Sequence, residues 1–288
     1  MHIRDYFDKA QSQGFAIGAF NAANLETIKA IVEAAHEMRS PVIIESSPGE
    51  TEYIQADNLV CLVNNFRQKY GLPIFINLDH SPTVSACQAA IQAGYDLIHV
   101  DTGKIDDWQE KINTTKQVVQ SAHSKGLLVE GEIDHITGSS TLHQEAVEQE
   151  QQQGNYTDVE QAAEFIWATE VDTFAAFVGN CHGMYATPPT LDVDRLKQIR
   201  QKTDVFLSLH GGSGIPADQI QAAIKQGGVV KINVNTEMRL AYRQKLEQVL
   251  QSNQELAVYK YMPDVIQAVK QVVIEKIKLF GSQGKADG

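Results

Sequence analysis

Short apolar segments alternate with longer amphipathic segments along almost the whole of this sequence. Eight segments read as buried strands, each followed by an expected helix. They cover residues 15–20, 41–47, 73–80, 97–101, 127–133, 173–179, 205–210 and 229–235. Eight strand–helix units within about 250 residues are typical of a (β/α)8 barrel. The alternation therefore constrains the fold more than any single motif does.

The expected strands are continuously apolar, which suits a sheet that is covered on both faces. An open doubly wound sheet is the alternative, but no GxGxxG follows the first strand. We predict an α/β fold in which residues 1–288 form one (β/α)8 TIM-barrel domain. A polar segment at about 134–157 interrupts the repeat and predicts a lid, a binding loop or a disordered segment, with a helical Glu/Gln-rich part. A C-terminal helix is expected at about 265–280.

Composition excludes several classes of partner. The formal net charge is −12 and the sequence shows no dense Lys/Arg cluster, so we expect no nucleic-acid surface. No apolar run approaches ~18 residues, so we expect no membrane span. The three cysteines (Cys61, Cys87 and Cys181) are too few and too far apart for a disulfide framework, which favours a cytoplasmic protein.

Polar residues gather at the expected carboxyl ends of the strands, where barrels build their active sites. These include three histidines from different segments: His80, His182 and His210. Three neutral imidazoles with one open position are typical of catalytic zinc. Any one of them alone is more often a hydrogen-bonded core residue. Asp79 precedes His80, so both reach one site only if the chain bends after the third strand.

Two loops point to a phosphate. The sequence VFLSLHGGSG places a glycine-rich turn directly after the seventh strand, where small residues let backbone N–H groups approach an anion. NVNT opens the helix after the eighth strand. Barrels often bind phosphate with these two loops, although NVNT also suits plain helix capping.

With these motifs in view, the chain resembles the class II, metal-dependent fructose-bisphosphate/tagatose-bisphosphate aldolase family. The resemblance runs from AIGAFNAANLET through LDHS, VDTFAAFVGNCHGMY, LHGGSGIP and KINVNTEMR to EKIKLFGSQGKA. It implies reversible cleavage of a ketose (bis)phosphate, such as fructose 1,6-bisphosphate, to dihydroxyacetone phosphate and an aldehyde. It also implies bound Zn2+ and a cytoplasmic homodimer or homotetramer that acts in carbohydrate metabolism such as glycolysis.

The resemblance also implies roles for individual positions. The residues that match the zinc ligands are His80, His182 and His210. Asp79 matches the aspartate that moves the proton of the aldehyde-side hydroxyl, and Asp101 and Glu132 match a second or alternative metal position. The residues that match substrate-binding positions are Gly183, Gly211, Gly212, Ser213, Asn233, Val234, Asn235, Thr236, Ser47 and Asn21. A monovalent cation, Na+ or K+, often lies near this phosphate cradle in the family.

Three departures from the family pattern bear on function. Ser140 and Thr141 stand where the family has an acidic pair, whose Glu transfers a proton at the dihydroxyacetone phosphate carbon. The residues of the same loop that could substitute for it are His135, His143 and Glu145. Glu52 replaces a basic residue after the second strand, and a charge there would disfavour a distal phosphate if it faces the site. Lys104 follows the fourth strand and could supply a displaced positive charge.

These departures leave three functional hypotheses. The first is an aldolase acting on a ketose phosphate, with glyceraldehyde 3-phosphate or a different, non-phosphorylated aldehyde as the second product. The second is a non-catalytic or regulatory paralogue that binds zinc and phosphate. The third is a phosphate-binding barrel with metal-independent isomerase chemistry.

Overall fold

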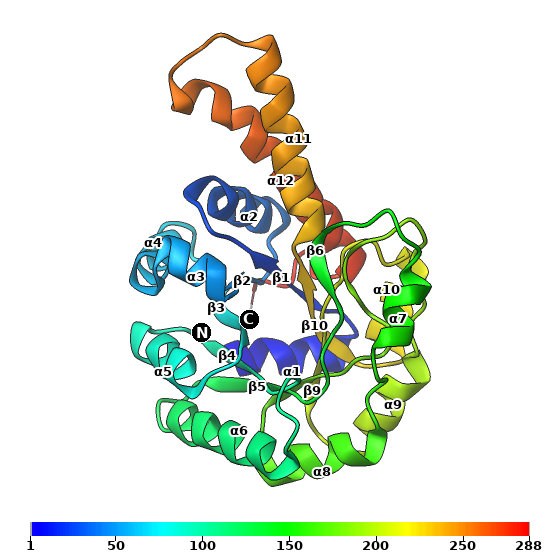
Figure 1. Ribbon diagram of the computed structural model, residues 1–288. Coiled ribbons are helices and arrows are strands. Elements are labelled where there is room, and N and C mark those ends of the chain that lie inside the picture. Colours follow the sequence, from blue (N-terminus) through cyan, green and yellow to red (C-terminus); the bar gives the residue numbers. More distant parts are fainter. Residues whose placement is uncertain (1, 288) are drawn as a thin grey trace.

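The computed structural model describes residues 2–287, which form a closed barrel of eight parallel strands surrounded by helices (Figure 1). In order around the barrel, the strands are β1 (Ile17–Asn21), β2 (Val42–Ser46), β3 (Ile74–Ser81), β4 (Leu97–Asp101), β5 (Leu128–Glu132), β7 (Thr173–Ala175), β9 (Phe206–Leu209) and β10 (Val229–Val234). β1 pairs with both β2 and β10, which closes the sheet. The predicted (β/α)8 TIM barrel is confirmed, and the doubly wound alternative is excluded.

Helices between the strands cover the outside of the barrel. They are α2 (Leu25–Met38), α4 (Ala56–Tyr70), α5 (Val84–Ala93), α6 (Trp108–His123), α8 (Val159–Thr169), α9 (Val193–Lys202), α10 (Ala217–Lys225) and α11 (Thr236–Ser252). Side-chain caps start α2, α5, α6, α8 and α9. In α2, for example, the side chain of Asn24 accepts from the backbone N–H of Thr27. Their apolar faces pack with the outward strand residues in one continuous core.

The N-terminal helix α1 (Ile3–Gln13) closes the amino end of the barrel and lies across it in Figure 1. Its apolar residues Ile3, Tyr6, Phe7 and Ala10 are buried. They pack against a layer of inward side chains near the starts of the strands, namely Ile17, Ile43, Phe75, Leu97, Leu128, Phe206 and Val230. The lower half of the barrel is therefore a packed apolar plug, and the polar site lies above it.

The predicted loop at about 134–157 is ordered. It contains a strand, β6 (Gly138–Leu142), and a short helix, α7 (Val147–Gln153). β6 pairs in parallel with β8 (His182–Met184), so a two-stranded sheet stands beside the mouth of the barrel. A further helix, α3 (Pro48–Ile54), follows β2 directly. The loop at about 134–157 therefore forms part of the wall of the site.

The last helix, α12, spans Val258–Phe280 and begins earlier than the predicted start near residue 265. The difference arises at Pro263, which signals a helix boundary in sequence but lies inside α12. α12 packs against α2 and α11, and the far ends of α11 and α12 form an arm that projects from the barrel (Figure 1). Among residues 2–287, no helix combines the length and apolarity that a bilayer crossing needs.

Candidate active site

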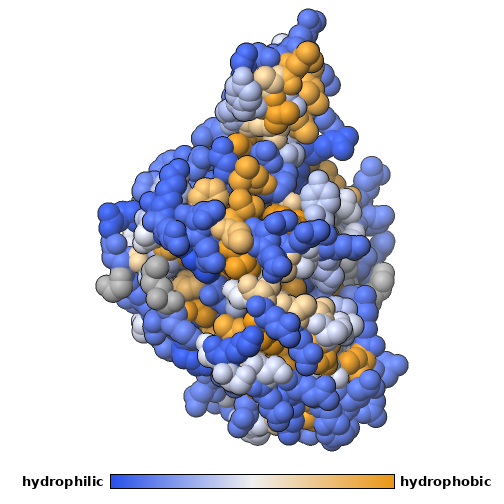
Figure 2. Space-filling model, turned by 90° about the vertical axis from the view of Figure 1, so that its left-hand side faces the viewer, coloured by the Kyte–Doolittle hydropathy of each residue, from blue (hydrophilic) through white to orange (hydrophobic). Residues whose placement is uncertain are grey.

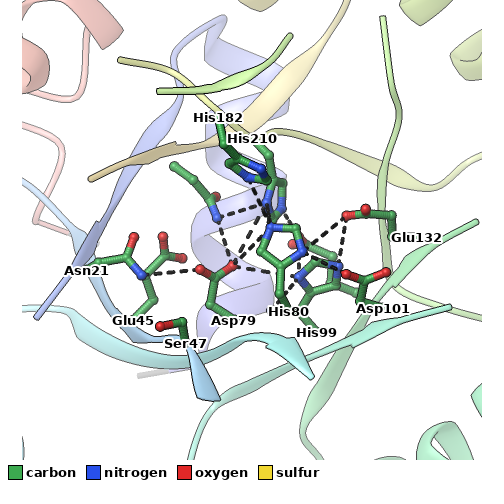
Figure 3. A network of polar contacts seen from close by, with 12 residues as sticks. Asn21, Glu45, Ser47, Asp79, His80, His99, Asp101, Glu132, His182 and His210 are labelled. Atoms are coloured by element: carbon green, nitrogen blue, oxygen red, sulfur yellow. Dashed lines mark hydrogen bonds and ion pairs between the residues drawn. The ribbon is translucent and has the colours of Figure 1, made fainter. Parts of the chain in front are cut away.

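The site is built from inward side chains that follow each other at intervals of two residues along the strands. On β4 these are Leu97, His99 and Asp101, and on β5 they are Leu128, Glu130 and Glu132. In each strand the first residue belongs to the apolar plug, whereas the other two join a polar network. Figure 3 shows His99, Asp101 and Glu132 in this network. The barrel thus changes from apolar to polar within about 7 Å along each strand, since a strand rises about 3.3 Å per residue.

β3 bends so that two consecutive residues, Asp79 and His80, both face this network. The register with β4 shifts between Leu78 and Ser81, and His80 has a left-handed backbone with φ of 48°. The His80 N–H, which the bend frees from the sheet, donates to Nδ1 of His99 at 3.0 Å. The bend that the Asp-His pair required is therefore present, and a buried histidine holds it.

The imidazole rings of His182 and His210 both contact the ring of His80 above the barrel. Nε2 of His80 lies 3.2 Å from Nε2 of His182 and 2.9 Å from Nδ1 of His210. Burial and the nearby His80 lower the pKa of His182 to about 3, and burial lowers the pKa of His210 to about 3 against its hydrogen bond to Glu130. Burial opposes a charge on His80 as well, but Asp79 and Glu132 raise the pKa of His80 to about 9. The cluster thus holds two neutral rings and one positive charge.

The ring nitrogens that face away from the cluster make hydrogen bonds, and these indicate which nitrogens remain for a metal ion. Nδ1 of His80 lies 3.0 Å from Asp101, and Nε2 of His210 lies 2.6 Å from Glu130. Because carboxylates accept hydrogen bonds, these two nitrogens carry protons. The facing nitrogen of His210 presents a lone pair, and Nε2 of His80 carries the proton that a bound cation would displace. Three ligand nitrogens around tetrahedral zinc lie about 3.3 Å apart, given Zn–N distances of about 2.0–2.1 Å. The two distances from His80, 3.2 Å to His182 and 2.9 Å to His210, are close to this value and suit a divalent cation such as zinc.

A second group of donors lies beside the first. His80, Asp101 and Glu132 offer ligand atoms that all lie within 4.8 Å of one another, and so do Asp79, His80, His99 and His210, whereas His182 belongs to neither set. Glu132 is fully buried, and both of its carboxylate oxygens lack a hydrogen-bond partner among the described residues. Burial and the nearby charge of Asp101 raise the pKa of Glu132. An unpartnered buried carboxylate that faces a histidine suits a second or alternative cation position.

Asp79 lies between two amides and the histidine cluster. Asn21 and Asn233 each donate to it at 3.2 Å. Burial opposes its ionisation, but the charge of His80 and the nearby ring of His99 hold the pKa of Asp79 well below its usual value. Asp79 is therefore a carboxylate with its oxygens directed into the cavity.

The glycine-rich turn after β9 meets the start of α11. The N–H of Gly212 donates to the carbonyl of Asn233 at 2.8 Å, which joins the two loops. Gly211 has φ of 63°, and a Cβ there would collide with the carbonyl of Cys181, so this turn requires glycine. The two loops lie against each other, as the prediction of a shared phosphate cradle requires.

A cavity of about 460 Å³ lies over the histidine cluster. Its wall includes most of the predicted site residues: Asn21, Ser47, Asp79, His80, Asp101, His182, Gly183, Gly211, Ser213, Asn233, Asn235 and Thr236. Glu132 and His210 lie just beneath it, buried in the network. Gly212 and Val234 lie outside the wall, and the Val234 side chain packs in the apolar core.

The residues that depart from the family pattern lie in different parts of the structure. Glu52 is exposed and lies outside the cavity wall, so its charge does not face the site. Ser140 and Lys104 do line the cavity. The two histidines of the loop also differ in position: His135 lines the cavity, whereas His143 stacks on Tyr185.

Several residues of the polar network were not predicted. His99 lies between Asp79 and Glu132, and Lys231 pairs with Glu130 at 3.0 Å in the barrel interior. Glu50 and Arg239 form an ion pair at the rim. A step of two residues back along the strand from Asp101, Glu132 or Asn233 would have found His99, Glu130 and Lys231.

Comparisons with known proteins agree with this geometry. The family model described as fructose-bisphosphate aldolase class II matches residues 1–285. The YdjI aldolase of Escherichia coli K12 is 32% identical, with a TM-score of 0.84 over 99% of this chain and 98% of that chain. A candidate fructose-1,6-bisphosphate aldolase of Coccidioides immitis is 27% identical, with a TM-score of 0.86 over 98% of this chain and 97% of that chain. The chain therefore belongs to the class II fructose-bisphosphate aldolase family.

Proposed function

We propose that the protein is a zinc-dependent aldolase that reversibly cleaves a ketose phosphate to dihydroxyacetone phosphate and an aldehyde. The observation that supports this most directly is the contact of His80 with His182 and His210, beside Asp79 and a glycine-rich loop at one cavity. Fructose 1,6-bisphosphate is the family's default substrate.

His80, His182 and His210 would hold the metal, on the contacts that His80 makes with the other two rings. Asp101 and Glu132, with His80, would form a second or alternative position. When bound, zinc supplies a Lewis acid that stabilises negative charge on the carbonyl side of the broken bond. Glu130 and Asp101 orient two of the rings by accepting their far-side protons.

The other residues bind the substrate and move protons. Gly183, Gly211 and Ser213, with the start of α11, would bind the phosphate through backbone N–H and hydroxyl groups and orient the substrate. A monovalent cation, Na+ or K+, would bind near this cradle. Asp79 would take the proton from the aldehyde-side hydroxyl as the carbon–carbon bond breaks and return it in the reverse direction.

The experiment that tests this function is solvent deuterium exchange into dihydroxyacetone phosphate, without any aldehyde. We expect the zinc-loaded protein to exchange a carbon-bound proton, and a chelator to abolish the exchange. Binding of dihydroxyacetone phosphate without exchange would contradict catalysis and support a binding paralogue, which the serine at position 140 motivates. Exchange that survives complete removal of the metal would contradict the zinc dependence.

We also propose that residues 1–288 act as one domain in a cytoplasmic homodimer or homotetramer. The three cysteines are free, which suits a reducing compartment. The arm of α11 and α12 carries exposed apolar side chains, namely Leu250, Leu256, Val258 and Tyr259, and Figure 2 shows an apolar patch on the arm. Such a patch supports association with a second copy of the chain.

A further inference from the structure

The ion pair between Glu50 and Arg239 is the feature of the cavity that the reaction described above does not use. Arg239 lines the main cavity, and its Nη2 donates to Oε1 of Glu50 at 2.6 Å. The other oxygen, Oε2, accepts from Asn21 at 2.8 Å and from the backbone N–H and the hydroxyl of Ser47 at 2.9 Å each. Glu50 is 9% exposed, so its charge lies largely out of water.

This pair lies on the side of the cavity where the aldehyde would lie. The amide of Asn21 donates both to Glu50 and to Asp79, so a single side chain separates the pair from the proposed base. Because Asp79 acts on the aldehyde-side hydroxyl, the next wall that the aldehyde portion meets is formed by Glu50 and Arg239. The phosphate cradle of the Gly211 loop serves the other half of the substrate.

A second cavity of about 200 Å³ continues from this wall. It shares Asn21, Asn235 and Arg239 with the main cavity. Its remaining lining is uncharged except for Glu50, and consists of Ala23, Asn24, Thr27, Met238 and Tyr242. The distal part of a substrate therefore meets amides, hydroxyls and one neutralised ion pair.

The charge balance of this wall disfavours a distal phosphate. The Arg239 side chain is half exposed, and its charge is already balanced by Glu50, so a distal phosphate bound to the guanidinium would also lie beside the Glu50 carboxylate. Lys104 is a further cation of the main cavity wall, but it is exposed on the loop after β4, beside His135. A carboxylate and a guanidinium together suit hydroxyl groups, which both accept and donate hydrogen bonds.

We propose that Glu50 and Arg239 select an uncharged polyhydroxy aldehyde, whose distal hydroxyls extend into the second cavity. This proposal rests on the aldolase function proposed above. Glu50 also completes the capping box of α3, which is its purely structural role. Glu50→Gln separates the two roles, because glutamine can complete a capping box but carries no charge.

The test measures kcat/KM in the direction of aldol addition, with dihydroxyacetone phosphate held constant. Glyceraldehyde is compared with glyceraldehyde 3-phosphate, and erythrose with erythrose 4-phosphate. We expect the wild-type protein to prefer each uncharged aldehyde by about tenfold or more, and Glu50→Gln to reduce that preference by about tenfold, in line with the strength of a charge-assisted hydrogen bond. A wild-type preference for the phosphorylated aldehydes overturns the proposal, even if the variant fails to fold.

Glu52→Gln is the matched control, because it removes the same charge from an exposed position of the same helix outside the cavity wall. A shift in preference that is equal in both variants would assign the effect to general charge and overturn the proposal. Thr27→Phe would fill the second cavity, so we expect it to impair addition to a pentose more than addition to glyceraldehyde. Deuterium exchange without aldehyde reports the donor half separately, so its absence would identify a failure of the proposed aldolase function instead.

Discussion

His135 is the loop histidine whose side chain lines the main cavity, whereas Glu145 of the same loop is exposed. Burial and the nearby charge of Lys104 lower the pKa of His135, so its ring is neutral at pH 7 and able to accept a proton. If His135 replaces the family's loop acid, His135→Asn should slow deuterium exchange into dihydroxyacetone phosphate by about 100-fold or more. His143→Asn is the control, and equal exchange rates in the two variants would rule out this role.

At the scale of single residues, the sequence predicted the outer layer of the site but not the layer beneath it. Polar residues at the ends of strands indicated His80, His182 and His210, because strand ends are where barrels bind ligands. His99 and Lys231 lie within apolar strands, where a polar residue gives no signal unless the inward direction of each strand is known. Glu50 was not predicted because its partner, Arg239, is far away in the sequence.

At the scale of elements, the bend in strand β3 is held by a hydrogen bond to His99. His99 accepts the N–H of His80 and places Nε2 at 3.2 Å from Glu132, so it supports both proposed metal positions. We expect His99→Ala to weaken zinc binding by about 10–100-fold, measured by competition with a chromophoric chelator. His99→Gln, which keeps a donor and an acceptor, should lose less affinity, and the absorption spectrum of bound Co2+ should change more in the alanine variant. Loss of stability with unchanged zinc affinity would contradict this role.

Helices with a long amphipathic pattern were predicted closely, whereas the short helix α3 and the short strand β6 were not predicted. Amphipathic patterns predict helices at residues 25–38 and about 56–70, and α2 and α4 have these bounds because each pattern is long. α3 has seven residues and depends on a capping box, while β6 depends on pairing with distant β8. Both are stabilised by tertiary contacts, which no local pattern reveals.

At the scale of the whole molecule, the arm is the part that packs least against the barrel, as Figure 1 shows. Leu256 and Tyr259 are 92% and 77% exposed there. If the arm joins two copies of the chain, the double substitution Leu256→Glu and Tyr259→Glu should shift the protein toward monomer in sedimentation or light scattering, with an unchanged circular dichroism spectrum. Trp167→Glu, at an exposed apolar position on α8, is the matched control. An unchanged assembly in the double variant would mean that the arm does not form the interface.

The apolar plug between α1 and the polar site makes the site a blind well with one exit. In the proposed cleavage, the phosphate-bearing half of the ketose lies deep against the buried His210 and Asn233, and the aldehyde half lies nearer the rim with Arg239. The aldehyde must then depart first, because it blocks the way out for dihydroxyacetone phosphate. Steady-state kinetics should therefore show dihydroxyacetone phosphate as a competitive inhibitor against the ketose and the aldehyde as a noncompetitive one. Because the fold closes one end of the barrel, it sets the order in which the two products leave the site.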